Sequence, residues 1–210
     1  TQYRYNYMTG LADKSQYFKI RGINFGLAKR LQIPDDYFTL SQTIGYQYFD
    51  LNNYYTGLFT FGDGVSNNLF YAIALSRNNT YTNPIFPTGG STFTIGAKLT
   101  FPYSSVNNID YGNLKNLAAY QDRSGNPDQA KIDQERFKWL EYYKLNFEGT
   151  WYTRIIDKLV LRTHAEFGFL GAYNPDRGNI PFERYFLGGD GLQQYAMDGR
   201  ETISLRGYPN

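Results

Sequence analysis

Residues 91–101 read STFTIGAKLTF, in which apolar and polar side chains alternate with a period of two. One face carries the apolar set Phe93, Ile95, Ala97, Leu99 and Phe101, and the other carries Thr92, Thr94, Gly96, Lys98 and Thr100. Because successive side chains of a β-strand point to opposite faces, this stretch predicts a strand with one apolar side and one polar side.

The same two-faced pattern recurs along the chain and predicts about seven strands. Their expected bounds are 2–9, 17–31, 37–50, 69–79, 91–101, 142–153 and 158–170. The second strand is the least regular, because its faces blur around Gly22 and Gly26, which favours bulges there. Segments of about ten residues can cross a bilayer when they are tilted. The pattern therefore predicts an all-β fold and a fragment of an antiparallel transmembrane β-barrel.

Ionisable side chains in the later strands fall on the face opposite the apolar one. The residues that we expect to face a polar lumen are Lys98, Lys144, Glu148, Arg162, His164 and Glu166. A charge on the lipid side of a barrel near the bilayer midplane costs about 2–4 kcal/mol, so a membrane barrel requires this sorting. A soluble sheet with a solvated outer face predicts the same alternation, so sorting alone leaves both architectures open.

The connections between the expected strands differ in length. Residues 32–36 and 154–157 are short connections, 80–90 is intermediate, and 51–68 and 102–141 are long. Outer-membrane barrels have short periplasmic turns and long extracellular loops. The alternation of lengths therefore predicts that the odd strands run outward and the even strands inward.

The longest connection is expected to contain a short helix. Asn126 is a suitable N-cap, Pro127 suits the first helical position, and Gln129 to Leu140 contains no helix breaker.

The amino-acid composition limits which kinds of partner and bound group the protein is expected to have. Mean hydropathy is -0.54, yet 19% of the residues are aromatic, including 21 Tyr and 16 Phe. Such aromatic content suits the girdles of a membrane barrel, and composition alone suits a soluble all-β protein equally well. A net charge of +2 gives no reason to expect a nucleic-acid partner. With no Cys and one His, we expect no disulfide, no metal site and no cofactor.

The chain begins within an expected strand, and seven strands leave two open edges. Open edges are not tolerated in lipid, because every backbone polar group there needs a partner within the protein. We therefore expect the functional barrel to contain strands that this sequence lacks.

Motifs near the end of the chain carry a family resemblance. Residues 181–192 read PFERYFLGGDGL, and GRE at 199–201 and LRGY at 205–208 follow. This order resembles the BamA family of outer-membrane-protein assembly factors. The segments FPTGGS at 86–91, LTFPYS at 99–104, WLEY at 139–142 and GFLG at 168–171 are similar to the family and its Bacteroidota branch. Two-partner secretion barrels and TamA-like proteins share the loop motif.

The resemblance implies a barrel of sixteen strands, of which these seven are the fifth to the eleventh. It also implies that residues 171–210 form a lumen-directed loop anchored by the motif Arg206, Gly207 and Tyr208. The glycines expected to shape this loop are Gly188, Gly189 and Gly191. An arginine fork can bind a carboxylate bidentately. The resemblance implies that the partner of Arg206 lies beyond Asn210, and Glu166 is an alternative within the chain.

The expected function is the folding and insertion of β-barrel proteins in the outer membrane of Gram-negative bacteria. The implied partners are nascent outer-membrane proteins, outer-membrane lipid and accessory assembly subunits. We expect no enzymatic activity, because His164 stands alone and no Gly-x-Ser-x-Gly elbow is present. The alternatives are a two-partner-secretion or TamA-like translocation barrel, a passive porin or transporter barrel, and a soluble β-rich binding protein.

Overall fold

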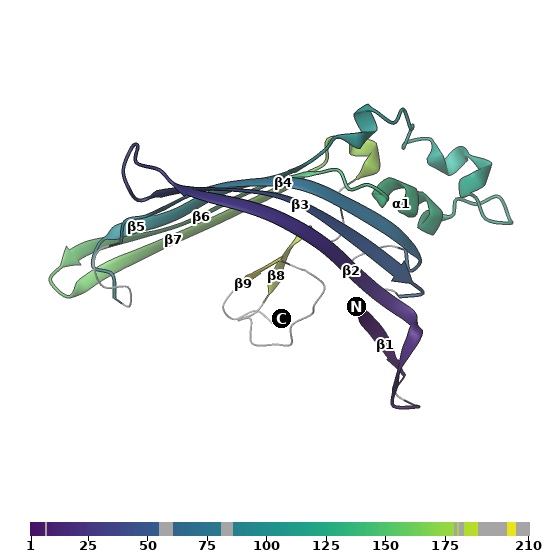
Figure 1. Cartoon of the computed structure of the whole chain (residues 1–210), viewed down its shortest axis with the longest axis horizontal. Coiled ribbons are helices and arrows are strands. Elements are labelled where there is room, and N and C mark those ends of the chain that lie inside the picture. Colours follow the sequence, from purple (N-terminus) through teal and green to yellow (C-terminus); the bar gives the residue numbers. More distant parts are fainter. Residues whose placement is uncertain are drawn as a thin grey trace.

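The chain forms one large antiparallel sheet in which every strand pairs with the next along the sequence (Figure 1). The computed structural model describes residues 1–6, 8–54, 61–80, 86–178, 180, 183–188 and 201–204. The sheet consists of β1 (Gln2–Asn6), β2 (Leu11–Arg30), β3 (Phe38–Asn52), β4 (Gly64–Asn78), β5 (Gly90–Thr100), β6 (Tyr143–Ile156) and β7 (Leu159–Gly171). A parallel pair, β8 (Tyr185–Gly188) and β9 (Glu201–Ser204), lies beneath its concave side. The predicted all-β, seven-stranded barrel fragment is confirmed.

Two strands begin several residues earlier than the alternation predicts. β4 starts at Gly64, because this residue already pairs with Leu51 of β3. β2 starts at Leu11, opposite Asn6 of β1. In both places the pairing continues past the residues whose side chains alternate, so the side-chain pattern underestimates the strand.

The predicted bulges at Gly22 and Gly26 are wrong. β2 pairs with β3 without interruption from Tyr17 opposite Asn52 to Arg30 opposite Thr39. Both glycines lie on the polar face, where the missing side chains hide the two-residue period. The ladder shifts register elsewhere, between β1 and β2 and near the turn of the β6–β7 hairpin.

Cross-strand pairing joins the apolar sides of the strands into one continuous surface, which we call the apolar face. Leu40, Leu75, Ile95, Phe147 and Phe167 form one row across it, each residue opposite the next. Ile95 is 51% exposed and Phe167 is 61% exposed, so no described segment covers them. Soluble monomeric proteins rarely leave a contiguous apolar surface of this kind exposed. In a membrane barrel it is the side that contacts lipid.

The position of the lipid can be tested with two adjacent residues of β5. In the full-length protein, Ile95→Arg should lower the free energy of unfolding by about 2–4 kcal/mol, because Ile95 is near the centre of the apolar face. Thr94→Arg should cost less than about 1 kcal/mol, since Thr94 lies on the polar face opposite Glu148. Urea unfolding in lipid vesicles measures both values. The reverse order would show that lipid contacts the other side.

At the end of the sheet where the long connections lie, the polar face supports an apolar core. Its buried members are Phe18, Phe49, Leu51, Phe61, Phe137, Leu140, Tyr142 and Ile180. Three of these come from β2 and β3, and the others come from the connections and the chain after β7. This core therefore closes over the inner side of the sheet at what we call the long-loop end.

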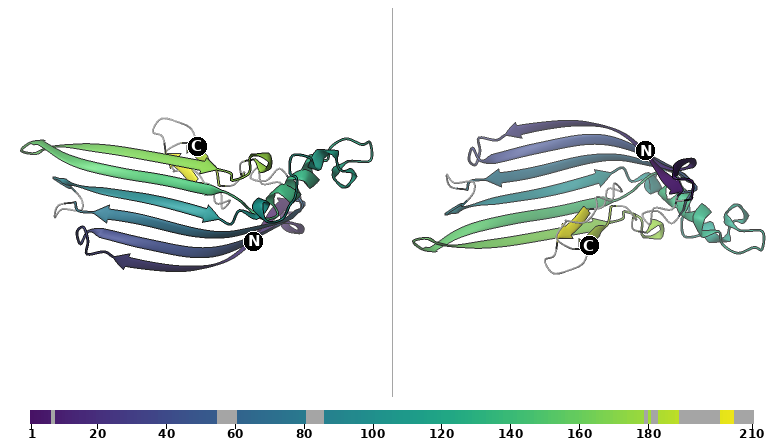
Figure 2. Two further views of the ribbon diagram at one scale, coloured as in Figure 1. Left: turned by 90° about the horizontal axis from the view of Figure 1, so that it is seen from above. Right: turned by 90° about the horizontal axis from the view of Figure 1, so that it is seen from below.

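Residues 101–142 form a folded unit that we call the cap, and Figure 2 shows it extending beyond one end of the sheet. It contains three 3-10 turns, Tyr103–Ser105, Leu114–Asn116 and Ala118–Tyr120, and the helix α1 (Gln129–Phe137). Tyr111, Leu114 and Ile132 are its own small core. No helix in the described parts of the chain is long and apolar enough to span a membrane.

The helix in the cap begins and ends elsewhere than predicted. Its N-cap is Asp128, whose carboxylate accepts a hydrogen bond from the Lys131 amide at 3.3 Å, and not Asn126. Pro127 precedes the helix, because it forms a bridge with Gln121. Aspartate caps a helix as well as asparagine does, so the sequence could not separate the two residues.

Candidate functional site on the polar face

Lys98 of β5 and Lys144 of β6 lie directly opposite each other on the polar face. Like charges in this arrangement destabilise a sheet. Glu183 bridges the two lysines and offsets one of their two charges, because its Oε1 is 2.6 Å from the Lys98 Nζ and its Oε2 is 3.5 Å from the Lys144 Nζ. The Lys144 side chain is only 9% exposed, so the ion pair is largely shielded from water and the loss of Glu183 would leave a charge in a poorly solvated place.

Tyr142 extends this cluster toward the apolar core. Its hydroxyl donates to Oε1 of Glu183 at 3.0 Å and accepts from the Asn68 amide at 3.3 Å. Burial, together with the negative charge of Glu183, raises the pKa of the Tyr142 phenol, so it remains a hydrogen-bond donor. The Asn68 amide also donates to Gln47 at 3.0 Å. The carboxylate of Glu183 is therefore bound by three separate groups of the sheet and its rim.

Tyr185 makes a second contact two residues further on. Its hydroxyl donates to the Leu145 carbonyl at 3.1 Å, and the Lys144 Nζ lies 4.4 Å from its ring centroid. The ring packs on Gly168 of β7, where an added Cβ would be 2.5 Å from the ring. A residue larger than glycine at 168 would therefore displace Tyr185.

The chain between β7 and these contacts is also fixed. We call residues 172–188 the return segment, of which all but 179, 181 and 182 are described. Arg177 is buried and its Nη1 is 2.7 Å from Oε2 of Glu141. It also donates to the carbonyls of Arg136 and Trp139 and stacks over the Tyr111 ring. Ile180 is buried in the apolar core.

The return segment is therefore held at positions 177, 180, 183 and 185 in succession, first by the cap and then by the polar face. In Figure 1 it leads from the cap end of the sheet to the space beneath its concave side, where β8 lies. The arrangement can hold a segment of chain firmly against the inner wall of a barrel. At Glu183, ion pairs with Lys98 and Lys144 make this attachment.

The six residues predicted to face the lumen all lie on the polar face, but the structure brings only Lys98 and Lys144 into this cluster. Glu148 and Glu166 lie opposite each other, and neither hydrogen-bonds to a described residue. His164 hydrogen-bonds to Thr150, with 3.0 Å between Nδ1 and the hydroxyl. Arg162 lies opposite Tyr152 toward the end of the β6–β7 hairpin.

Most of the predicted loop motif lies outside the described residues. The motif residues outside the described part of the chain are Arg206, Gly207, Tyr208, Gly189 and Gly191. Gly188 is described and is the last residue of β8. The proposed pairing of Arg206 with a carboxylate, Glu166 included, therefore stays a prediction.

Sequence reasoning missed Glu183 although it lies in the quoted segment PFERYF. The signal was available, because two lysines on neighbouring polar faces need a carboxylate that the strands themselves do not supply. What the sequence lacked was the strand register, which alone shows that Lys98 and Lys144 are directly opposite each other.

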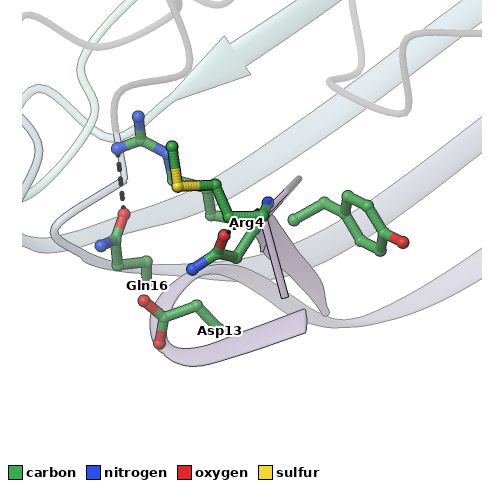
Figure 3. Close-up of a pocket in the computed structure, with 6 residues that line it drawn as sticks. Arg4, Asp13 and Gln16 are labelled. Carbon is green, nitrogen blue, oxygen red and sulfur yellow. Dashed lines mark hydrogen bonds between the residues drawn. The ribbon is translucent and has the colours of Figure 1, made fainter. Parts of the chain in front are cut away.

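A hollow of about 450 Å³ lies beside the β1–β2 hairpin (Figure 3). Arg4, Asp13 and Gln16 border it, and the Arg4 guanidinium donates to Gln16 at 3.0 Å. Most of its lining side chains are exposed, and it is open to solvent. We therefore place the candidate site at the return segment and not at this hollow.

Comparison with known proteins agrees with this architecture. A family model described as the Omp85 superfamily domain matches residues 2–210. No curated protein matches the chain. The match includes all seven strands of the sheet as well as the return segment, so the resemblance deduced from the motifs is confirmed at the level of the superfamily. The chain belongs to the Omp85 superfamily, a group of outer-membrane β-barrel proteins that assemble or translocate other proteins.

Proposed function

We propose that this chain is part of a BamA-type assembly factor, which folds and inserts β-barrel proteins into the bacterial outer membrane. The observation that supports the proposal best is the attachment of the return segment to the polar face through Glu183, Lys98 and Lys144. A barrel that handles protein clients has to control its lumen, and a segment held there by specific ion pairs serves that purpose.

The proposed barrel has sixteen strands, and this sheet supplies seven of them. In a Gram-negative cell the long connections, including the cap, face the outside and the short turns face the periplasm. The partners we propose are nascent outer-membrane proteins, outer-membrane lipid and accessory assembly subunits, without nucleic acid. Incoming strands would pair with an open edge of the barrel, as exposed strand edges do. The activity requires no covalent chemistry and no cofactor.

A two-partner-secretion or TamA-like translocation barrel is the second candidate, since these proteins share the loop motif. A passive porin is less compatible with the apolar core at the long-loop end. In porins the lumen is a water-filled channel, whereas Phe49, Leu51 and Ile180 bury apolar surface on the inner side of this wall.

Reconstitution of the full-length protein in lipid vesicles distinguishes these functions. A urea-denatured β-barrel client should fold about tenfold faster than in empty vesicles, which corresponds to a barrier lower by about 1.4 kcal/mol. Protease protection and heat-modifiable migration of the client measure its insertion. Transfer of the client into the vesicle interior would indicate translocation instead, and a large, steady conductance without faster client folding would indicate a porin.

A further inference from the structure

Cationic side chains flank the apolar residues of β2 on the apolar face, Lys19 and Arg21 toward the long-loop end and Lys29 toward the other end. From the long-loop end onward, this face of β2 carries Arg21, Ile23, Phe25, Leu27 and Lys29, as their partners on β3 show. At about 3.3 Å per residue and a tilt of about 40°, Arg21 and Lys29 are roughly 20 Å apart along the membrane normal. The apolar band of a membrane barrel is about 25 Å tall. Arg21 therefore lies close to the boundary of the hydrocarbon region.

The side chain of Arg21 borders a shallow hollow of about 370 Å³ on the apolar face. Gly22, Ile23, Tyr46 and Tyr48 form the rest of its border. Among the residues that the structure describes, no carboxylate is within salt-bridge distance of Arg21. Arg77 differs in this respect, because it lies toward the short-turn end of the same face and pairs with Asp35 at 2.7 Å.

Lys19 adds a second positive charge two residues before Arg21, on the same face. Its Nζ lies 4.8 Å from the centroid of the Tyr17 ring. Asp50, opposite Lys19, accepts a hydrogen bond from the Tyr17 hydroxyl at 3.5 Å. The local balance is therefore two cations to one carboxylate, which leaves this boundary region positively charged.

We propose that Arg21 and Lys19 bind the phosphate of a membrane lipid whose acyl chain lies along Ile23 and Phe25. A guanidinium binds phosphate through two parallel hydrogen bonds, and the long side chain of an arginine at the hydrocarbon boundary can extend outward to the lipid headgroups. Ile23 is 57% exposed and Phe25 is 67% exposed, so both are available to an acyl chain. The inference requires the membrane barrel but not the assembly activity, and it applies whichever leaflet the long-loop end occupies.

The test uses the full-length protein in nanodiscs of phosphatidylcholine with a minor fraction of phosphatidylglycerol. Native mass spectrometry after release from the nanodisc counts the phosphatidylglycerol that stays bound. The double variant Arg21→Gln/Lys19→Gln should retain about tenfold less of it than the wild type, and Asp50→Asn should retain more. Heat-modifiable migration on gels shows that each variant is folded.

Lys115→Gln is the control, because it removes an exposed positive charge from the cap, away from the apolar face. It should leave lipid retention unchanged, and a loss equal to that of the double variant would indicate only bulk charge attraction. Unchanged retention in the folded double variant would overturn the site. Complete displacement of the lipid by inorganic phosphate would show a phosphate site without a lipid track.

Discussion

Arg177→Met should open the cap while the sheet stays folded. The Arg177 and Glu141 side chains are 4% and 1% exposed, and removing one partner of such a buried pair costs about 3–5 kcal/mol. The carbonyls of Arg136 and Trp139 would also lose a donor. Hydrogen–deuterium exchange of the full-length protein should show cap amides, that of Ile132 in α1 among them, losing roughly 150- to 5,000-fold in protection. Amides in β3 to β5 should keep theirs.

Arg123→Met is the matched control, because Arg123 is an exposed arginine of the same cap with no hydrogen bond or ion pair among the described contacts. Its cap amides should exchange as in the wild type. The double variant Arg177→Met/Glu141→Met tests the cause, because it removes both buried charges together and should recover part of the lost protection. If Arg177→Met left the cap protected, the ion pair would not be what holds the cap to the return segment.

The Arg177 contacts have a consequence beyond stability, because they join the cap to the lumenal cluster. Arg177 is fixed by the cap, Ile180 by the apolar core, and Glu183 by the polar face, all within seven positions of the chain. A disturbance of the cap would therefore reach Glu183 through a short, well-anchored segment. The effect of Arg177→Met on client folding would then be indirect, which makes it separable from the effect of changing Glu183 itself.

Strand alternation was sufficient to predict the sheet, because a period of two depends only on which side chains meet lipid. It failed where side chains are missing, as at Gly22 and Gly26, and where backbone pairing continues beyond the alternating residues, as at Gly64. The N-cap of α1 was misplaced for a local reason, since Asn126 and Asp128 are chemically equivalent caps. None of these errors moved a residue to the wrong face.

The site could be predicted only in part. The alternation within each strand was enough to place Lys98 and Lys144 on the polar face. That the two lysines lie directly opposite each other depends on the register between strands, which a single sequence does not specify. The contact of Tyr185 with Gly168 joins a loop to a strand, and no local pattern encodes it. Long-range contacts of the return segment therefore required the structure, whereas the sheet did not.

Glu183→Gln is expected to release the return segment from the polar face. The substitution leaves Lys98 and Lys144 directly opposite each other without the carboxylate that joins them. Loss of two charge-assisted contacts in a partly buried cluster costs about 2–3 kcal/mol, which is roughly a 30- to 150-fold change in the attachment equilibrium. Protection of the return-segment amides against hydrogen–deuterium exchange measures the attached fraction, and the vesicle assay gives the rate of client folding.

Glu148→Gln is the control, since it removes the same charge from the polar face at a carboxylate that lies opposite Glu166 and has no described hydrogen bond. It should leave the attachment and the client folding rate unchanged. Gly168→Ala, tested by client folding alone, is a second variant, because its Cβ would be 2.5 Å from the Tyr185 ring while every charge stays in place. If both Glu183→Gln and Gly168→Ala slow client folding and Glu148→Gln does not, attachment of the segment and not lumenal charge is what the activity needs. Detachment in Glu183→Gln with a normal folding rate would instead separate the anchor from the proposed function.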